Sequence, residues 1–266
     1  MTGVQTCPLP ISYKYFGDWT ERVAKGELPK SKPERPSGVE RNIVVTTWDW
    51  GNEKQYLHDG IATDRRKPTV NAYGPLYGSP EYSTDNIPIL DVKTHTVTYF
   101  KAQTREGTPE ALGPGHAASD KLLAPSPYWG QEKIWDTKAN NHNSMLDQDG
   151  RVWMAAAVRG PNNPDWCKAG SDHPSAKVFP LARTNRALSV LDPKTMKYTM
   201  VDTCFQTHHL QFGYDANNTL WTSGGGPVVG WLNTKLFLET GDEKKAQGWT
   251  RSEEHTSELQ SRGLIS

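Results

Sequence analysis

Three histidines occupy comparable places in this sequence of 266 residues and could carry chemistry together. His58 opens HDGIATDRRKPTVNAYG, His142 opens HNSMLDQDGRVWMAA and His209 opens HLQFGYDANNTLWTSGGG. In each stretch we expect a short strand, then a polar turn containing Asp, then a second strand. Imidazoles that converge from repeated positions can bind a metal ion or share a proton-transfer role. The alternative is that each histidine caps its strand through a hydrogen bond to a neighbouring element.

The residues beside these histidines complete the candidate site. His142 and His209 are the candidate catalytic residues. The candidate ligand-binding residues are His58, Asn141, Asn143 and Gln211. For the amides, ordinary hydrogen bonding at a strand end is the alternative. Because neighbours on a strand point to opposite faces, we expect at most one of His208 and His209 to face the site, and the repeat selects His209.

Antiparallel hairpins must position these side chains. The turns DQDG and DANN suit tight hairpins, because Asp, Asn and Gly tolerate a positive φ. A second kind of hairpin follows in IPILDVKTHTVTYF and ALSVLDPKTMKYTMV, which both read as a strand, an Asp-x-Lys-Thr turn and a strand. An inner and an outer hairpin together make the four antiparallel strands of a β-propeller blade. A β-sandwich whose hairpins are similar by chance is the alternative.

The sequence therefore predicts an all-β fold, a partial β-propeller in which about three four-stranded blades are visible, with long loop insertions and short helices near the ends. The histidines are further apart than the roughly 40–45 residues of one blade, so insertions are expected. We place them at 101–140, at 159–186 and, as a short helix, from near Asn233 onward. Because closed propellers have about 4–8 blades, we expect this chain to be a fragment.

The two ends of the chain differ from its middle. RSEEHTSELQS resembles the translation of a sequencing-adapter oligonucleotide, and TGVQTC-x-LPI resembles the translation of its reverse complement. Residues 1–12 and 251–266 are therefore expected to be foreign to the protein, with a genuine tail as the alternative. Between them we expect a short helix and a Pro-rich linker over 13–41 and the incomplete propeller over 42–250.

Cysteine usage indicates an oxidising compartment. Cys7 falls in the adapter-like start, which leaves Cys167 and Cys204. One lies in the 159–186 insertion and the other follows the outer strand of the same blade, so a disulfide between them would pin a long loop. Two unrelated buried thiols are the alternative. We expect a periplasmic or extracellular protein, although the sequence shows no signal peptide.

Composition and motifs disfavour several functions. Basic and acidic residues both number 30, so no net charge attracts nucleic acid or an anionic membrane. No apolar run approaches the roughly 20 residues of a transmembrane helix. DQDG lacks the Glu of a calcium loop, and SGGGPVVG lacks the Lys-Ser/Thr of a phosphate-binding loop. The expected partner is a small molecule, a glycan or a protein at the propeller mouth.

The motif H-x-x-x-x-D-x-x-G-x-hydrophobic-Trp, which begins at His142, resembles the virginiamycin B (streptogramin) lyase type of β-propeller. The wider run from ERNIVVTTWDWGNEKQYLHD to GWLNTKLF is similar to exported bacterial propellers of unknown activity, known mainly for a carboxypeptidase-regulatory-like domain elsewhere in a longer chain. The lyase resemblance implies elimination across a C–O bond, with Mg²⁺ or another divalent cation, a His base and a Glu near the metal.

Only the histidines of that pattern carry over, at His142 and His209, because neither inner-strand motif contains a Glu. Three functions are therefore expected from the sequence. The first is a propeller that binds a ligand at its mouth, the second is a metal-dependent lyase, and the third is a purely structural propeller domain.

Overall fold

The structure is a computed structural model that describes residues 21–22, 24–26, 57, 59–105, 137–223 and 227–251. The chain divides into two compact units, Met1–Thr47 and Trp48–Ser266. In the first unit the described residues include one helical turn, where Lys25 Nζ lies 2.6 Å from Glu21 Oε1. The predicted Pro-rich linker lies outside the described residues.

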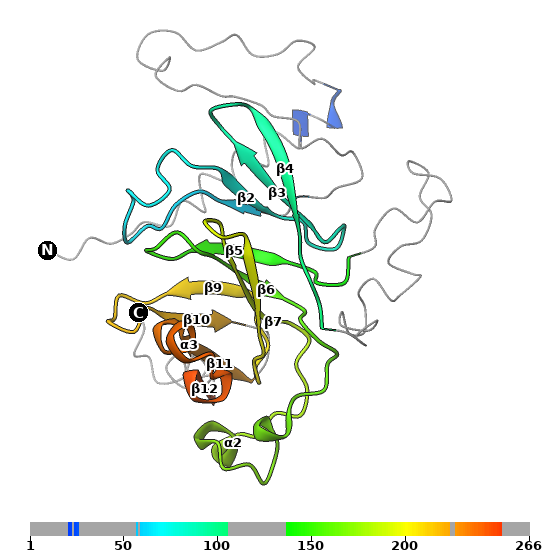
Figure 1. The fold of residues 1–266 in the computed structure, drawn as a ribbon. Helices are drawn as coiled ribbons and strands as arrows, with labels where there is room; N and C mark the ends of the chain where they lie inside the picture. The colour runs from blue at the N-terminus through cyan, green and yellow to red at the C-terminus, as the bar shows by residue number, and fades with distance from the viewer. Residues whose placement is uncertain are drawn as a thin grey trace, which may run out of the picture. The chain divides into compact units, whose positions relative to one another are not determined.

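The described part of the second unit contains three antiparallel four-stranded sheets, each a meander in chain order (Figure 1). Sheet 1 consists of β1 (Asp59–Ile61), β2 (Leu76–Ser79), β3 (Asn86–Asp91) and β4 (Thr96–Lys101). Sheet 2 consists of β5 (His142–Leu146), β6 (Val152–Ala156), β7 (Ala187–Asp192) and β8 (Lys197–Val201). Sheet 3 consists of β9 (His209–Phe212), β10 (Thr219–Ser223), β11 (Val228–Asn233) and β12 (Gln247–Arg251). The all-β prediction is confirmed.

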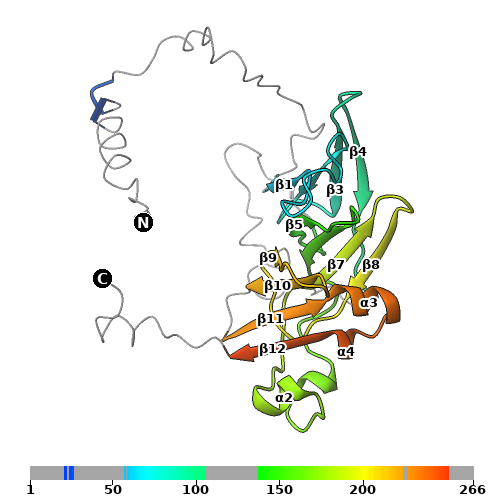
Figure 2. The same ribbon diagram turned by 90° about the vertical axis from the view of Figure 1, so that its left-hand side faces the viewer.

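The three sheets meet along their first strands, because β5 contacts β1 on one side and β9 on the other. The two views of Figures 1 and 2 show the sheets following one another in chain order. Burial between neighbouring sheets holds them together. Sheets 2 and 3 enclose one apolar cluster that includes Trp153, Leu188 and Leu232, and sheets 1 and 2 enclose another that includes Ile87 and Met154.

The turn residues act as the sequence predicts. In the DQDG turn, Asp147 Oδ1 accepts hydrogen bonds from the backbone N–H groups of Asp149 and Arg151 at 2.9 and 3.0 Å. Asp91 and Asp192 do the same in the outer hairpins, where they accept from the N–H two residues ahead. Each carboxylate thus satisfies backbone donors that a tight turn leaves open.

The stretch after His58 departs from the prediction. The second strand expected in TVNAYG is wrong, because residues 62–75 form a loop and β2 begins only at Leu76. Asn71, at φ 52°, closes this loop by donating hydrogen bonds from Nδ2 to the carbonyls of Ala62 and Pro75, at 2.7 and 2.9 Å. The side-chain amide thereby takes up carbonyls that a regular hairpin ladder would otherwise have paired.

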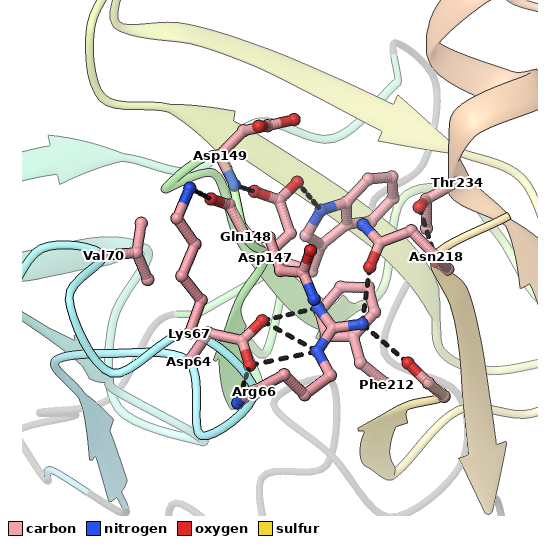
Figure 3. Close-up of polar contacts among 12 residues, drawn as sticks. Asp64, Arg66, Lys67, Val70, Asp147, Gln148, Asp149, Phe212, Asn218 and Thr234 are labelled. Atoms are coloured by element: carbon pink, nitrogen blue, oxygen red, sulfur yellow. Dashed lines mark hydrogen bonds and ion pairs between the residues drawn. The ribbon is translucent and has the colours of Figure 1, made fainter. Parts of the chain in front are cut away.

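This 62–75 loop joins sheet 1 to sheet 3 through Arg66 (Figure 3). The guanidinium pairs with the buried carboxylate of Asp64. Its Nη1 donates hydrogen bonds to the carbonyl of Gly213 at 2.7 Å and to Asn218 Oδ1 at 2.6 Å, both in the β9–β10 turn. The guanidinium carbon also lies 4.4 Å from the ring centroid of Phe212. One side chain therefore connects two sheets that are not consecutive.

Short helices lie in two connections. The 159–186 insertion holds a 3-10 turn (Asp165–Cys167) and α2 (Pro174–Val178), which packs against β12. α3 (Thr234–Thr240) and α4 (Glu243–Ala246) join β11 to β12, which confirms the short helix expected after Asn233. Asn233 Oδ1 caps α3 by accepting from the backbone N–H of Leu236 at 2.9 Å. No helix in the described ranges is long and apolar enough to cross a bilayer.

The predicted disulfide is present between Cys167 and Cys204, whose Cα atoms are 5.4 Å apart. Both cysteines are buried in a cluster with Phe205 and Trp249. The bond links the 159–186 insertion to the segment between sheets 2 and 3. Strand β12 runs to Arg251, which is the first residue of the adapter-like segment, and the rest of that segment lies outside the described residues.

Candidate functional site

His142 and His209 occupy equivalent places, as the repeat predicts. Each is the first residue of the first strand of its sheet, β5 and β9 respectively. His142 is buried, with 1% of its surface exposed, whereas His209 is exposed. Their ring centroids are 5.6 Å apart. His58 directly precedes β1 in the sequence and lies outside the described residues.

His208 joins this pair, which the sequence reasoning excluded. Its ring stacks on His142 at a centroid distance of 4.2 Å and lies 4.1 Å from the ring of His209. The alternation rule did not apply, because β9 begins only at His209 and His208 is not in a strand. One ligand atom from each of the three imidazoles lies within 4.8 Å of the other two. We call these three residues the histidine cluster.

A buried ion pair borders the histidine cluster. Glu81, from the β2–β3 connection, places Oε2 3.3 Å from His142 Nδ1, while its other carboxylate oxygen pairs with the guanidinium of Arg186. Both side chains of the Glu81–Arg186 pair are at least 94% buried: the exposed fractions are 4% and 6%. Burial opposes ionisation of Glu81, but the hydrogen bond to His142 and the charge of Arg186 outweigh burial and lower its pKa to about 2.

The electrostatic surroundings also keep His208 neutral near pH 7. Burial makes the largest contribution, followed by the charges of His142, His209 and Arg186, and together they lower the pKa of His208 to about 4. Glu81 acts in the opposite direction but does not compensate. A neutral imidazole keeps one ring nitrogen able to accept a proton or a metal ion.

The candidate amides occupy three different environments. Asn143 connects the first strands: its Oδ1 accepts from the Leu210 N–H at 2.6 Å, and its Nδ2 lies 3.4 Å from Asp59 Oδ2. Asn141 is completely buried, and neither of its amide atoms has a hydrogen-bond partner among the described residues. Gln211 is exposed and donates to the carbonyl of Phe212. Asn143 thus holds the strands in place, and Asn141 retains unused polar capacity beside His142.

His173 shows what a purely structural histidine looks like in this chain. Its Nδ1 accepts from the backbone N–H of Ser175 at 3.2 Å, and its Nε2 lies 3.1 Å from the carbonyl of Lys244. Its ring stacks on Trp249 at 4.8 Å. Both ring nitrogens are therefore engaged by backbone groups. In the histidine cluster the imidazoles instead face one another.

A separate pocket of about 680 Å³ lies at the start of β3 and the end of β4. Its acidic residue, Asp85, already accepts hydrogen bonds from Thr137 Oγ1 and from the backbone N–H groups of Lys138 and Ala139. This carboxylate serves to fasten the segment that leads into β5. The pocket shares no lining residue with the histidine cluster.

Sequence reasoning missed Glu81, Arg186 and His208. The doublet HH before a predicted strand was a usable signal for His208. Nothing local signals Glu81, since it lies in a connection of sheet 1 and Arg186 directly precedes β7 of sheet 2. Comparisons with protein-family models, with curated proteins and with solved structures returned no match to this chain.

Proposed function

We propose that this chain is part of an exported bacterial β-propeller and that the starts of β5 and β9 form the binding site for a small polar molecule or glycan. The observation that carries the proposal is the convergence of the histidine cluster with the buried Glu81–Arg186 pair. Burying an ion pair costs desolvation free energy that the attraction of the pair often does not repay, so stability alone is a weak reason for a buried pair beside His142. Asn141, next to His142 in the sequence, adds to that argument, because its amide has no hydrogen-bond partner in the described part of the chain.

The arrangement of the sheets supports the propeller. Three meanders meet along their first strands, as blades do around a channel. Sheet 3 exposes Trp221, 42% of whose surface is accessible, and its ring lies 5.7 Å from that of Trp231. Aromatic side chains on a sheet face are suited to packing against a further blade. The disulfide fits export, since such bonds persist in oxidising compartments.

An exposed aromatic residue that follows Glu81 in the chain favours a glycan over other small molecules. Tyr82 follows Glu81, is 37% exposed, and donates its backbone N–H to Asn140 Oδ1 at 3.1 Å. Its φ of 63° is uncommon for a bulky residue, and such conformations cluster at functional sites. An exposed phenol ring offers a sugar a flat apolar surface and a polar edge.

A binding screen tests this proposal. Neutral and acidic mono- and disaccharides would be titrated into the whole chain by calorimetry, alongside the variants His209→Ala and Tyr82→Ala. We expect at least one sugar class to bind, with affinity lower by about tenfold, or 1.4 kcal/mol, in each variant. Trp221→Ala, on the face of sheet 3, is the control and should bind as the wild type does. Absence of binding, or equal binding by all variants, would overturn the proposal.

The lyase alternative gains one observation, because Glu81 supplies beside His142 the acid that the inner-strand motifs lack. The donors do not fit Mg²⁺, however. Mg²⁺ prefers an octahedral shell of oxygen ligands, whereas the described residues around His142 provide imidazoles and one carboxylate that Arg186 already engages. Elimination through magnesium is therefore the weaker proposal for this site.

A further inference from the structure

We propose that His142, His208 and His209 bind a divalent transition metal of the zinc class, and that Glu81 is the positioning residue for His142. The inference uses the same strand ends as the proposed function and deepens it by naming a cofactor class. Imidazole nitrogens are ligands that Zn²⁺, Co²⁺, Ni²⁺ and Cu²⁺ favour over Mg²⁺ and Ca²⁺. Three protein ligands with one open position are the usual composition of a reactive zinc site.

The spacing of the cluster is close to what such an ion requires. Nitrogens bound at about 2.0–2.1 Å in a tetrahedron are about 3.4 Å apart. The three ligand atoms lie within 4.8 Å of one another, so small ring movements would bring them into range. His142 is buried, His208 is half-buried and already stacks on His142, and His209 is exposed. The exposed side of His209 would leave the open position accessible.

Glu81 gives His142 the orientation that a metal ligand needs. Its carboxylate lies 3.3 Å from Nδ1, so the proton of a neutral imidazole belongs on Nδ1 and Nε2 is presented as the ligand. Metal-bound histidines commonly rest on a carboxylate in this way. Arg186 pairs with the same carboxylate and holds it in place. Glu81 offsets part of the positive charge of Arg186 beside the cluster, although Arg186 still outweighs it at His208.

A hydrogen bond to Asn143 fixes the backbone near the histidine cluster. Asn143 Oδ1 accepts the Leu210 N–H at 2.6 Å and so ties the start of β9 to the start of β5. His208 and His209 are thereby held beside His142 even though they lie more than sixty residues away in sequence. The three ligands lie at or just before the first strands of two sheets, and the amide of Asn143 links those strands.

Metal titration of the whole chain, after removal of bound metal with a chelator, tests the inference. We expect one Zn²⁺ per chain by calorimetry, no heat with Mg²⁺, and the visible d–d absorption of a tetrahedral site with Co²⁺. His208→Asn and His209→Asn should each weaken Zn²⁺ binding at least tenfold. The matched control is His95→Asn, in the exposed β3–β4 turn at φ 57°, a conformation that Asn tolerates; it should bind as the wild type does.

Glu81→Gln separates a positioning role from a general effect on the fold. It should weaken Zn²⁺ binding by about 10–100-fold and change the Co²⁺ absorption, while circular dichroism of the metal-free chain stays that of the wild type. If Glu81→Gln unfolds the chain, His208→Asn and His209→Asn still decide the question, because neither residue is buried. Zn²⁺ binding that is absent, or that survives both histidine substitutions, would overturn the inference.

The sugar screen distinguishes this failure from failure of the proposed function. Sugar binding that persists in the presence of chelator while no metal binds would remove only the metal site. Metal binding without any sugar partner would leave the metal site and remove the proposed ligand.

Discussion

Replacing Arg66 by Met should destabilise the chain by about 3–5 kcal/mol, which is the usual cost of removing one partner of a buried ion pair. The carboxylate of Asp64 is 3% exposed and the guanidinium is 2% exposed, so neither charge is well hydrated. Arg66→Met would leave Asp64 charged and buried. Among the described residues, the donor that remains for its carboxylate is the backbone N–H of residue 66, which lies 2.7 Å from Oδ1 in the wild type. It would also free the Gly213 carbonyl and Asn218 Oδ1 from their shared donor (Figure 3).

The double variant Asp64→Asn/Arg66→Met makes the reasoning specific. Without the charge on residue 64, loss of the guanidinium should cost less, and the two substitutions should be coupled by about 1–3 kcal/mol. Lys67→Met is the matched control. Its exposed ammonium donates to the carbonyl of Gln148 at 3.0 Å, and its loss should change the free energy of unfolding by less than about 0.5 kcal/mol.

Urea unfolding followed by tryptophan fluorescence measures these differences, since Trp153 is completely buried between sheets 2 and 3. The reasoning would be refuted by an Arg66→Met variant within about 1 kcal/mol of the wild type. It would equally be refuted if the double variant were no more stable than the single one. Either result would mean that the 62–75 loop does not hold sheets 1 and 3 together.

Three further predictions concern other parts of the fold. Gly230→Ala should lower the thermal unfolding temperature and reduce the free energy of unfolding by about 1–3 kcal/mol, because a Cβ there would lie 2.1 Å from the ring of Phe205. Gly160→Ala is the control, since its Cβ would meet no atom within 4 Å and the substitution should be neutral. Thiol titration of the unreduced, denatured chain should find only Cys7 reactive, and additional reactive thiols would contradict the disulfide. The double variant Cys167→Ser/Cys204→Ser should lower the free energy of unfolding by roughly 3–4 kcal/mol. The pKa of Glu81 is lowered from 4.5 to about 2, so its ionisation stabilises the fold above pH 4.5 and this contribution, on the order of 3 kcal/mol, is lost as the pH falls toward 2. Glu81→Gln should therefore flatten the stability–pH curve in that window, and an unchanged slope in urea unfolding at stepped pH would count against the ion pair.

Local turn chemistry made most of the sheet structure predictable. The Asp residues of DQDG and of the two Asp-x-Lys-Thr turns bond to backbone donors within four residues, so their effect is visible in a short window of sequence. The second strand after His58 was mispredicted for the complementary reason. Asn71 stabilises a loop by bonding to carbonyls nine residues before it and four after it, a pattern that residue propensity does not reveal.

Of the candidate site, only the residues at repeated positions in the sequence were predictable. The repeat placed His142 and His209 at matching strand starts, and the structure agrees. Glu81 and Arg186 are 105 residues apart in sequence, and their contact depends on how sheets 1 and 2 pack. His208 was excluded by a rule that holds inside strands, whereas the strand begins one residue later. Contacts between sheets, and the boundaries of strands, are what a single sequence specifies least directly.

The connection made by Arg66 has a consequence for the order of folding. The carbonyl that accepts its hydrogen bond belongs to a residue 147 positions later in the chain. At a synthesis rate of about 5–20 residues per second, Arg66 would be synthesised roughly 7–30 s before that partner. During this interval the guanidinium has only Asp64 and water as partners, and the 62–75 loop lacks its anchor. Sheet 1 is made first, but its loop can reach the native state only after the turn of sheet 3 has formed.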